Sequence, residues 1–153
     1  MQTQETVAGY EISTDARRLN LDVIHAFLAQ ESYWSQGVPR SVVERAIANS
    51  LCFGGYHGDV QVGFARVVTD RSTFALLADV FVLKGHRGKG LSKWLVRCVD
   101  EHEDLQGLRL FLLATPDAHG LYRQFGFDAP GSPSRFMEVF RPAISRSPCR
   151  AFP

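Results

Sequence analysis

The sequence has few cysteines, no long apolar run and almost no excess of charge of either sign. Its 153 residues include only three cysteines, Cys52, Cys98 and Cys149, too few and too scattered for a disulfide framework. This scarcity favours a reducing, cytoplasmic setting. The apolar runs 74–77 and 110–114 are far shorter than the roughly 20 residues that a membrane helix needs. We therefore expect no membrane association.

The charge balance excludes a further class of partner. The 17 lysines and arginines nearly cancel the 16 aspartates and glutamates, which leaves a formal net charge of +1. Without a basic excess, nucleic acid is not an expected partner. The histidines show no i, i+4 pair and no cysteine neighbour, so no metal site is expected. The first residues lack the basic and then apolar regions of a secretory signal.

The chain shows neither an internal repeat nor a low-complexity linker. We therefore predict one domain over residues 1–140. Residues 141–153 contain three prolines and three arginines and have no apolar periodicity. This composition predicts a flexible, solvated tail.

Apolar periodicity predicts a mixture of helices and strands. Helical spacing occurs over residues 15–30, 41–50, 91 to about 107, and 117–125. Strand-like runs occur over residues 51–56, 61–69, 73–83, 108–114 and 135–140. An antiparallel meander followed by helix, strand, helix and strand predicts an α+β fold in which helices pack on a central sheet.

The most informative segment lies where an apolar strand gives way to the helix that begins at Leu91. Glycines and cations are gathered there: Gly85, Arg87, Gly88, Lys89, Gly90 and Lys93. Glycine permits close approach of a ligand to the backbone, and the first amides of a helix favour a phosphate or pyrophosphate. The spacing matches neither GxGxxG nor GxxxxGK[ST]. Taken alone, such glycines could equally serve only to allow the chain to turn between two elements.

Two motifs in this sequence resemble those of the GNAT superfamily of acyl-CoA-dependent N-acetyltransferases. Residues 87–92, RGKGLS, match the Q/R-x-x-G-x-G/A signature, with Ser92 in the last small-residue position. Residues 112–127 resemble the strand, turn and helix that end A-x-x-LY-x-x-x-GF. The resemblance covers residues 51–140. It implies a mixed, mostly antiparallel central sheet flanked by helices and splayed between its fourth and fifth strands.

The resemblance also implies acetyl-CoA as the cofactor. The backbone of Val80, Phe81 and Val82 would hold the pantetheine arm, and an amide near Phe81 would polarise the thioester carbonyl. The amides of residues 88–92 would bind the pyrophosphate. The residues expected at the cofactor are Val80, Phe81, Val82, Arg87, Gly88, Lys89, Gly90, Leu91, Ser92 and Thr115.

Two residues are candidates for proton transfer. Tyr122 matches the family tyrosine that protonates the departing thiolate, although it could instead be a packed core aromatic. Asp79 is the candidate base, because residues two apart on a strand share a face and Asp79 lies two before Phe81. A structural ion pair is the alternative for Asp79. Ala78 stands where the similar E-D-x-x-V strand of polyamine acetyltransferases has its first acid.

The acceptor side has no specific motif. Glu31, Tyr33 and Trp34 lie in the loop that lines the acceptor pocket in many relatives, where aromatic rings and an acid could bind a cationic amine. Alternatively, Trp34 anchors this loop to the core. Asp117 is expected to be the N-cap of the short helix.

These observations predict an enzyme that transfers an acetyl group from acetyl-CoA to a primary amine by direct attack in a ternary complex. The acceptor would be a small-molecule or peptide amine. The alternative is a non-catalytic acyl-CoA-binding regulatory module. A homodimer is compatible with the resemblance, because dimers are common among relatives.

Overall fold

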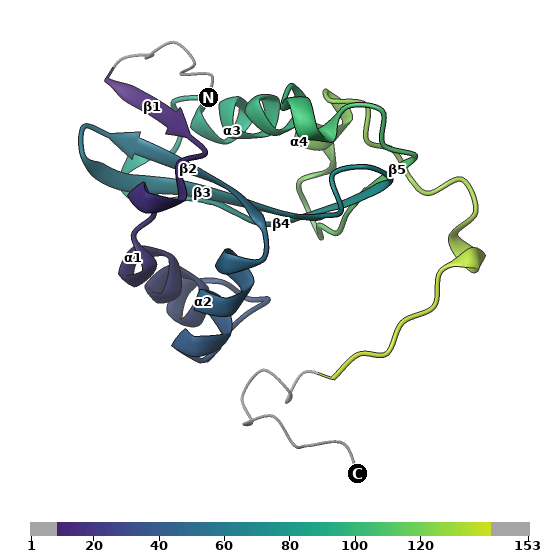
Figure 1. The fold of residues 1–153 in the computed structure, drawn as a ribbon, viewed down its shortest axis with the longest axis horizontal. Coiled ribbons are helices and arrows are strands. Elements are labelled where there is room, and N and C mark those ends of the chain that lie inside the picture. The colour runs from purple at the N-terminus through teal and green to yellow at the C-terminus, as the bar shows by residue number, and fades with distance from the viewer. Residues whose placement is uncertain (1–8, 142–153) are drawn as a thin grey trace.

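The computed structural model describes residues 9–141, and these residues form one five-stranded sheet (Figure 1). The strands lie in sequence order across the sheet: β1 Tyr10–Ser13, β2 Leu51–His57, β3 Val60–Thr69, β4 Phe74–Val82 and β5 Leu110–Leu113. Neighbouring strands from β1 to β4 pair antiparallel, whereas β4 and β5 pair parallel. The mixed, mostly antiparallel sheet predicted from the sequence is confirmed.

Helices cover both faces of this sheet (Figure 1). Helices α1 Leu21–Ala26 and α2 Arg40–Ala48 lie on one face, and α3 Leu91–Asp100 and α4 His119–Arg123 lie on the other. Short helical turns complete the set: Ala16–Arg18, Phe27–Glu31, Lys84–His86, Glu103–Leu105 and Pro133–Arg135. Each face has its own apolar core, with Phe64 and Ile24 fully buried on the α1 side and Leu95 fully buried on the α3 side.

The sheet opens between β4 and β5. The two strands pair only through residues 74–77 of β4 and Leu110–Leu113 of β5, after which β4 continues to Val82 without a β5 partner. Within this unpaired stretch, Asp79 has a φ of +53°, and two residues of β4 oppose the single residue Ala65 of β3. Such a bulge bends a strand and redirects its side chains. The splay predicted between the fourth and fifth strands is thus present.

Several predicted element bounds differ from the structure. The expected helix over residues 15–30 is instead a 3-10 turn, helix α1 and a π-helical turn. The reason is local: Asp15 and Asn20 accept backbone N–H bonds from Arg17 and Val23, so each side chain begins a new helical element. Strand β1 was not predicted, because four residues are too few to show a period.

The predicted strand over residues 135–140 is wrong for this structure. These residues form part of a 3-10 turn and then an extended segment that pairs with no strand among the described residues. A strand exists only through its hydrogen-bonded neighbour, and composition alone cannot supply one. Of the predicted tail 141–153, all but Arg141 lies outside the described residues, as does Cys149.

Candidate functional site

The turn between β4 and α3 is shaped by glycines with left-handed backbone. Gly88 has a φ of +77° and Gly90 a φ of +81°, and a Cβ built on either would meet no atom within 4 Å. Gly90 is the N-cap of α3 and supplies no side-chain cap to the first helical amides. These amides have no acceptor within the helix, so the open space beside the glycines suits an anion.

The cations of this turn differ in how they are held. Arg87 donates from Nε to the carbonyl oxygen of Val82 at 2.8 Å, which ties the turn to the end of β4. Lys89 and Lys93 are exposed at the start of α3. The side chain of Leu91 is buried in the core, so only its backbone faces the turn. Ser92 is half-buried beside it.

A contact that the sequence did not predict ties the turn to the first strand. The Tyr10 hydroxyl lies 2.8 Å from Nδ1 of His86, a residue of the turn Lys84–His86. Strand β1 lies at the far edge of the sheet from β5. The position of the glycine turn therefore depends on a residue 76 positions away in the sequence.

The stretch of β4 that has no β5 partner, residues 78–82, contains one acidic side chain, Asp79, and its backbone is unpaired on the β5 side. Phe81 stacks on Phe27 of the α1 face with ring centroids 3.9 Å apart, and Val82 is buried in the other core. Phe81 and Val82 pair with β3 on one side, Val80 lies in the bulge, and none of the three pairs with β5. A strand edge of this kind can hydrogen-bond an extended, amide-bearing ligand.

Asp79 accepts two side-chain hydrogen bonds at the bulge. Trp34 donates from Nε1 to Oδ1 at 2.9 Å, and Arg66 donates from Nε to Oδ2 at 2.8 Å. Arg66 also donates to the Ser50 hydroxyl at 3.1 Å. The ion pair considered for Asp79 is therefore present, and Trp34 is anchored to β4. The sequence analysis missed Arg66 and Ser50, although a lone arginine inside the apolar run 61–69 was a usable signal.

Tyr122 lies on α4 with only 8% of its surface exposed. It lines a cavity of about 320 Å³ together with the end of β5, Thr115, His119 and Phe127. Burial raises the pKa of the Tyr122 phenol above its usual value, and the nearby Tyr33 phenol adds to that effect.

The start of α4 corrects one prediction. The N-cap is Ala118, and its backbone N–H donates to the Thr115 hydroxyl at 3.0 Å, so Asp117 does not cap the helix. Thr115, expected at the cofactor, therefore also holds the turn that precedes α4. The threonine hydroxyl fills this role because it reaches the amide three residues onward.

The acceptor-side residues are exposed. Tyr33 and Trp34 are 64% and 43% exposed and meet edge to face with ring centroids 4.9 Å apart. Glu31 is exposed at the end of the π-helical turn Phe27–Glu31. The indole N–H of Trp34 is anchored to Asp79, while its ring remains accessible.

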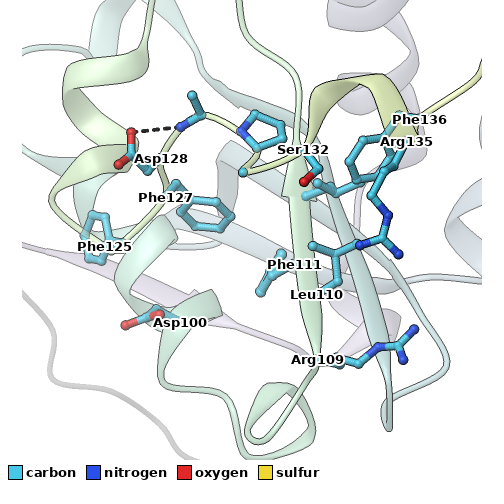
Figure 2. Close-up of a pocket in the computed structure, with 15 residues that line it drawn as sticks. Asp100, Arg109, Leu110, Phe111, Phe125, Phe127, Asp128, Ser132, Arg135 and Phe136 are labelled. Atoms are coloured by element: carbon cyan, nitrogen blue, oxygen red, sulfur yellow. Dashed lines mark hydrogen bonds between the residues drawn. The ribbon is translucent and has the colours of Figure 1, made fainter.

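A second, larger cavity adjoins the Tyr122 cavity and shares Phe111 and Phe127 with it. It has a volume of about 840 Å³ and lies beside β5 (Figure 2). Its aromatic lining residues come from β5, from the chain after α4 and from the carboxy-terminal segment: Phe111, Phe125, Phe127 and Phe136. The sequence analysis assigned nothing to this place.

Residues 9–141 contain neither a membrane-spanning helix nor a cluster of metal-ligating side chains. No helix in this part of the chain has the length and apolar character needed to cross a membrane. Within the same residues, no group of three or more histidine, cysteine, aspartate or glutamate side chains is arranged to hold a metal ion.

Comparison with known proteins gives consistent matches. Residues 48–129 match the family described as "Acetyltransferase (GNAT) domain". A crystal structure described as a GNAT-family acetyltransferase from Xanthomonas campestris pv. campestris is 48% identical, with a TM-score of 0.88 over 93% of this chain and 100% of that chain. A protein of Gibberella zeae named as an acetyltransferase is 33% identical over 139 residues, covering 76% of this chain and 77% of its own. An aminoglycoside N-acetyltransferase in complex with CoA shares the fold, with 17% identity and a TM-score of 0.58 over 86% of this chain and 93% of that chain.

Proposed function

Because the chain belongs to the GNAT family of acetyltransferases, we propose that it transfers an acetyl group from acetyl-CoA to a primary amine by direct attack in a ternary complex. The observation that carries this proposal is the unpaired stretch of β4 leading directly into the open glycine turn at α3. Together they offer an extended hydrogen-bonding edge followed by an anion site, which fits a pantetheine arm joined to a pyrophosphate.

The cofactor-binding residues follow from this fit. The backbone of Val80, Phe81 and Val82 binds the extended arm, and the amides of residues 88–92 bind the pyrophosphate. Gly88 and Gly90 leave the space that a Cβ would fill. We assign Arg87 and Lys89 of the glycine turn, and Thr115 before α4, to the same cofactor site. CoA bound to a fold neighbour supports this assignment.

Acetyl-CoA, when bound, supplies the acetyl group as an activated thioester. The main chain near Phe81 polarises the thioester carbonyl with an amide N–H. The amine nitrogen forms a bond to the carbonyl carbon while the carbon–sulfur bond breaks. Tyr122 donates its phenolic proton to the departing sulfur and regains a proton from water. This phenol is protonated at neutral pH, and burial raises the pKa of Tyr122 further above neutrality.

The amine must also lose a proton, and Asp79 is our candidate acceptor for it. An ionised carboxylate has about four lone-pair sites, and Trp34 and Arg66 occupy two of them. The remaining sites can accept a proton from the amine or from a bridging water. The same hydrogen bonds give Asp79 a positioning role, since it holds the acceptor loop against β4.

The acceptor binds beside Tyr33 and Trp34. Their accessible rings, with the Glu31 carboxylate in the same loop, attract a cationic amine. Both a small-molecule amine and a peptide amine fit this exposed surface.

The test is release of free CoA thiol from acetyl-CoA across a panel of amines, with Tyr122→Phe as the control variant. We expect turnover with at least one amine and a large loss in the variant. Stabilisation by acetyl-CoA without turnover of any amine would instead support the acyl-CoA-binding regulatory module. Absence of both binding and turnover would contradict the proposal.

A further inference from the structure

The ion pair between Arg66 of β3 and Asp79 of β4 is largely buried. The exposed fractions of the two side chains are 18% and 11%. A buried ion pair adds little net stability, because the loss of hydration offsets most of the attraction between the charges. Stability alone therefore does not account for this pair, and its place in the acceptor half of the site points to a role in binding.

Both partners of the pair have hydrogen-bonding capacity left. Arg66 donates from Nε to Asp79 and from Nη1 to the Ser50 hydroxyl, whereas its Nη2 group donates to no atom of residues 9–141. Each oxygen of Asp79 accepts one side-chain hydrogen bond, which leaves it a further lone-pair site. The pair thus offers a cationic donor and an anionic acceptor next to each other.

A small cavity adjoins this pair on the face of the sheet that α1 and α2 cover (Figure 1). Its volume is about 90 Å³, and Arg66, Asp79 and Ser35 form the polar part of its lining. The other lining residues are apolar and come from β3, α1, α2 and the segment between the two helices. Pockets for drug-sized ligands have roughly 300–1,000 Å³. This cavity has the volume share of about three water molecules, which suits a short aliphatic group.

Helix α2 contributes apolar side chains to this cavity that are incompletely buried. Val42, Ala46 and Ile47 line the cavity and are half-buried, whereas Ile24 and Phe64, which also line it, are fully buried. Removing further apolar surface from water is favourable. An aliphatic group in the cavity would therefore gain free energy by covering these α2 side chains.

We propose that the acceptor is a free α-amino acid with a short aliphatic side chain. Its amine binds Asp79, its carboxylate binds Nη2 of Arg66, and its side chain occupies the cavity. An α-amino acid carries its two opposite charges on groups attached to one carbon, so it complements two opposite charges that lie side by side. Arginine is also well suited to carboxylates, because its guanidinium presents donors in a planar fork.

This inference rests on the proposed function, and it identifies the amine of that reaction. The new amide bond forms at the α-amine, the carbon–sulfur bond of the thioester breaks, and the products are an N-acetylamino acid and CoA thiol. Asp79 passes the surplus proton of the ammonium group to water. An amine without a carboxylate would leave Nη2 of Arg66 without a partner, and a large side chain would not fit the cavity.

The first test is calorimetric titration of valine into the full chain, with and without CoA, which carries no acetyl group to transfer. Valinamide, which lacks the carboxylate, and phenylalanine, which has a larger side chain, serve as comparison ligands. We expect valine to bind about tenfold or more tightly than either. Equal or weaker binding of valine overturns the proposal, whether or not the protein acetylates any amine.

The role of Arg66 is tested by the ratio of the dissociation constants for valinamide and valine. Arg66→Lys keeps the positive charge but loses the planar fork, so we expect this ratio to fall by about tenfold. A purely structural role would weaken both ligands equally, and an unchanged ratio therefore overturns the assignment. Arg71→Lys is the matched control, because Arg71 also pairs with an aspartate, Asp104, but does not line the cavity. This variant should keep the ratio of the unaltered protein.

Filling the cavity tests where the side chain binds. Ala46→Met should lower the affinity for valine by about tenfold and leave that for glycine unchanged, because glycine has no side chain to displace. Ala48→Met is the matched control, since Ala48 is exposed on the same helix and does not line the cavity. An equal loss for valine and glycine in the Ala46 variant overturns this placement.

Release of CoA thiol from acetyl-CoA separates this inference from the proposed function. We expect a higher kcat/KM with valine than with valinamide or phenylalanine. Equal kcat/KM for valine and for amines without a carboxylate overturns the amino-acid acceptor and leaves the acetyltransferase proposal intact. Tight binding of valine without turnover of any amine supports the amino-acid site and contradicts the proposed function.

Discussion

The two halves of the candidate site are built from different parts of the chain. The cofactor half consists mainly of backbone, from the unpaired stretch of β4 to the glycine turn and the start of α3. The acceptor half consists of side chains from distant segments, such as Trp34 and Asp79, which lie 45 residues apart. A backbone site needs particular φ angles, whereas a side-chain site needs particular neighbours.

The largest expected effect comes from Gly90→Asp, which tests the backbone half. Aspartate places a side chain at a φ of +81° and a negative charge beside the pyrophosphate site. We expect CoA affinity to fall by about 100-fold or more, measured by isothermal titration calorimetry. Gly58→Asp is the matched control, because Gly58 has a φ of +61° and open surroundings in a different turn. Equal loss in both variants would mean a general folding defect.

Tyr122→Phe should have the next largest effect. Removing the proton donor should lower kcat by about 100-fold while CoA affinity stays unchanged. The active protonated form of Tyr122 predominates at neutral pH and is lost as pH rises through its pKa, which burial raises. Unaltered enzyme should therefore show a loss of rate on the alkaline side of its pH profile that the variant lacks.

The matched control for Tyr122→Phe is Tyr56→Phe. Tyr56 is also buried, and its hydroxyl has no hydrogen-bond partner among residues 9–141. Removing that hydroxyl should leave kcat unchanged, because no bond is lost. A similar fall in kcat for both variants would point to packing rather than proton transfer.

Asp79→Ala and Asp79→Asn test the residue that lies between the cofactor half and the acceptor half. We expect Asp79→Ala to lose turnover, by roughly tenfold or more, and to keep most of its CoA affinity. Asp79→Asn retains an oxygen for the Trp34 indole but loses the negative charge. If asparagine restored full turnover, Asp79 would be a positioning residue alone. Equal loss of turnover and CoA affinity would assign it a structural role.

The smallest effect is expected from Trp34→Phe, which removes the indole hydrogen bond to Asp79 and keeps an aromatic ring. The KM for the amine should rise by a few-fold while CoA affinity is unchanged. Tyr10→Phe is its counterpart in the cofactor half, since it removes the contact with His86 of the glycine turn. That variant should weaken CoA binding by a few-fold and leave the amine KM unchanged. The opposite pattern would contradict the division into two halves.

The sequence is most informative where local chemistry decides structure. It predicts β2, β3, β4 and the start of α3 closely, because apolar periodicity and turn residues act over a few positions. The end of α3 was placed too late, since the helix stops at Asp100 and not near residue 107. Prediction from the sequence failed over residues 15–30, where Asp15 and Asn20 cap separate elements. It also assigned a strand to residues 135–140, which have the composition of a strand but no neighbour in this structure.

The glycine turn and its family motif could be identified from the amino-acid order alone, because an anion site at a helix start depends on consecutive backbone amides and on glycines that permit them. The acceptor half was decided by tertiary structure. Only the folded sheet and its bulge bring Trp34, Arg66 and Asp79 together. Hydrogen bonds between segments far apart in sequence depend on how the elements pack, and residue order along the chain does not report that packing.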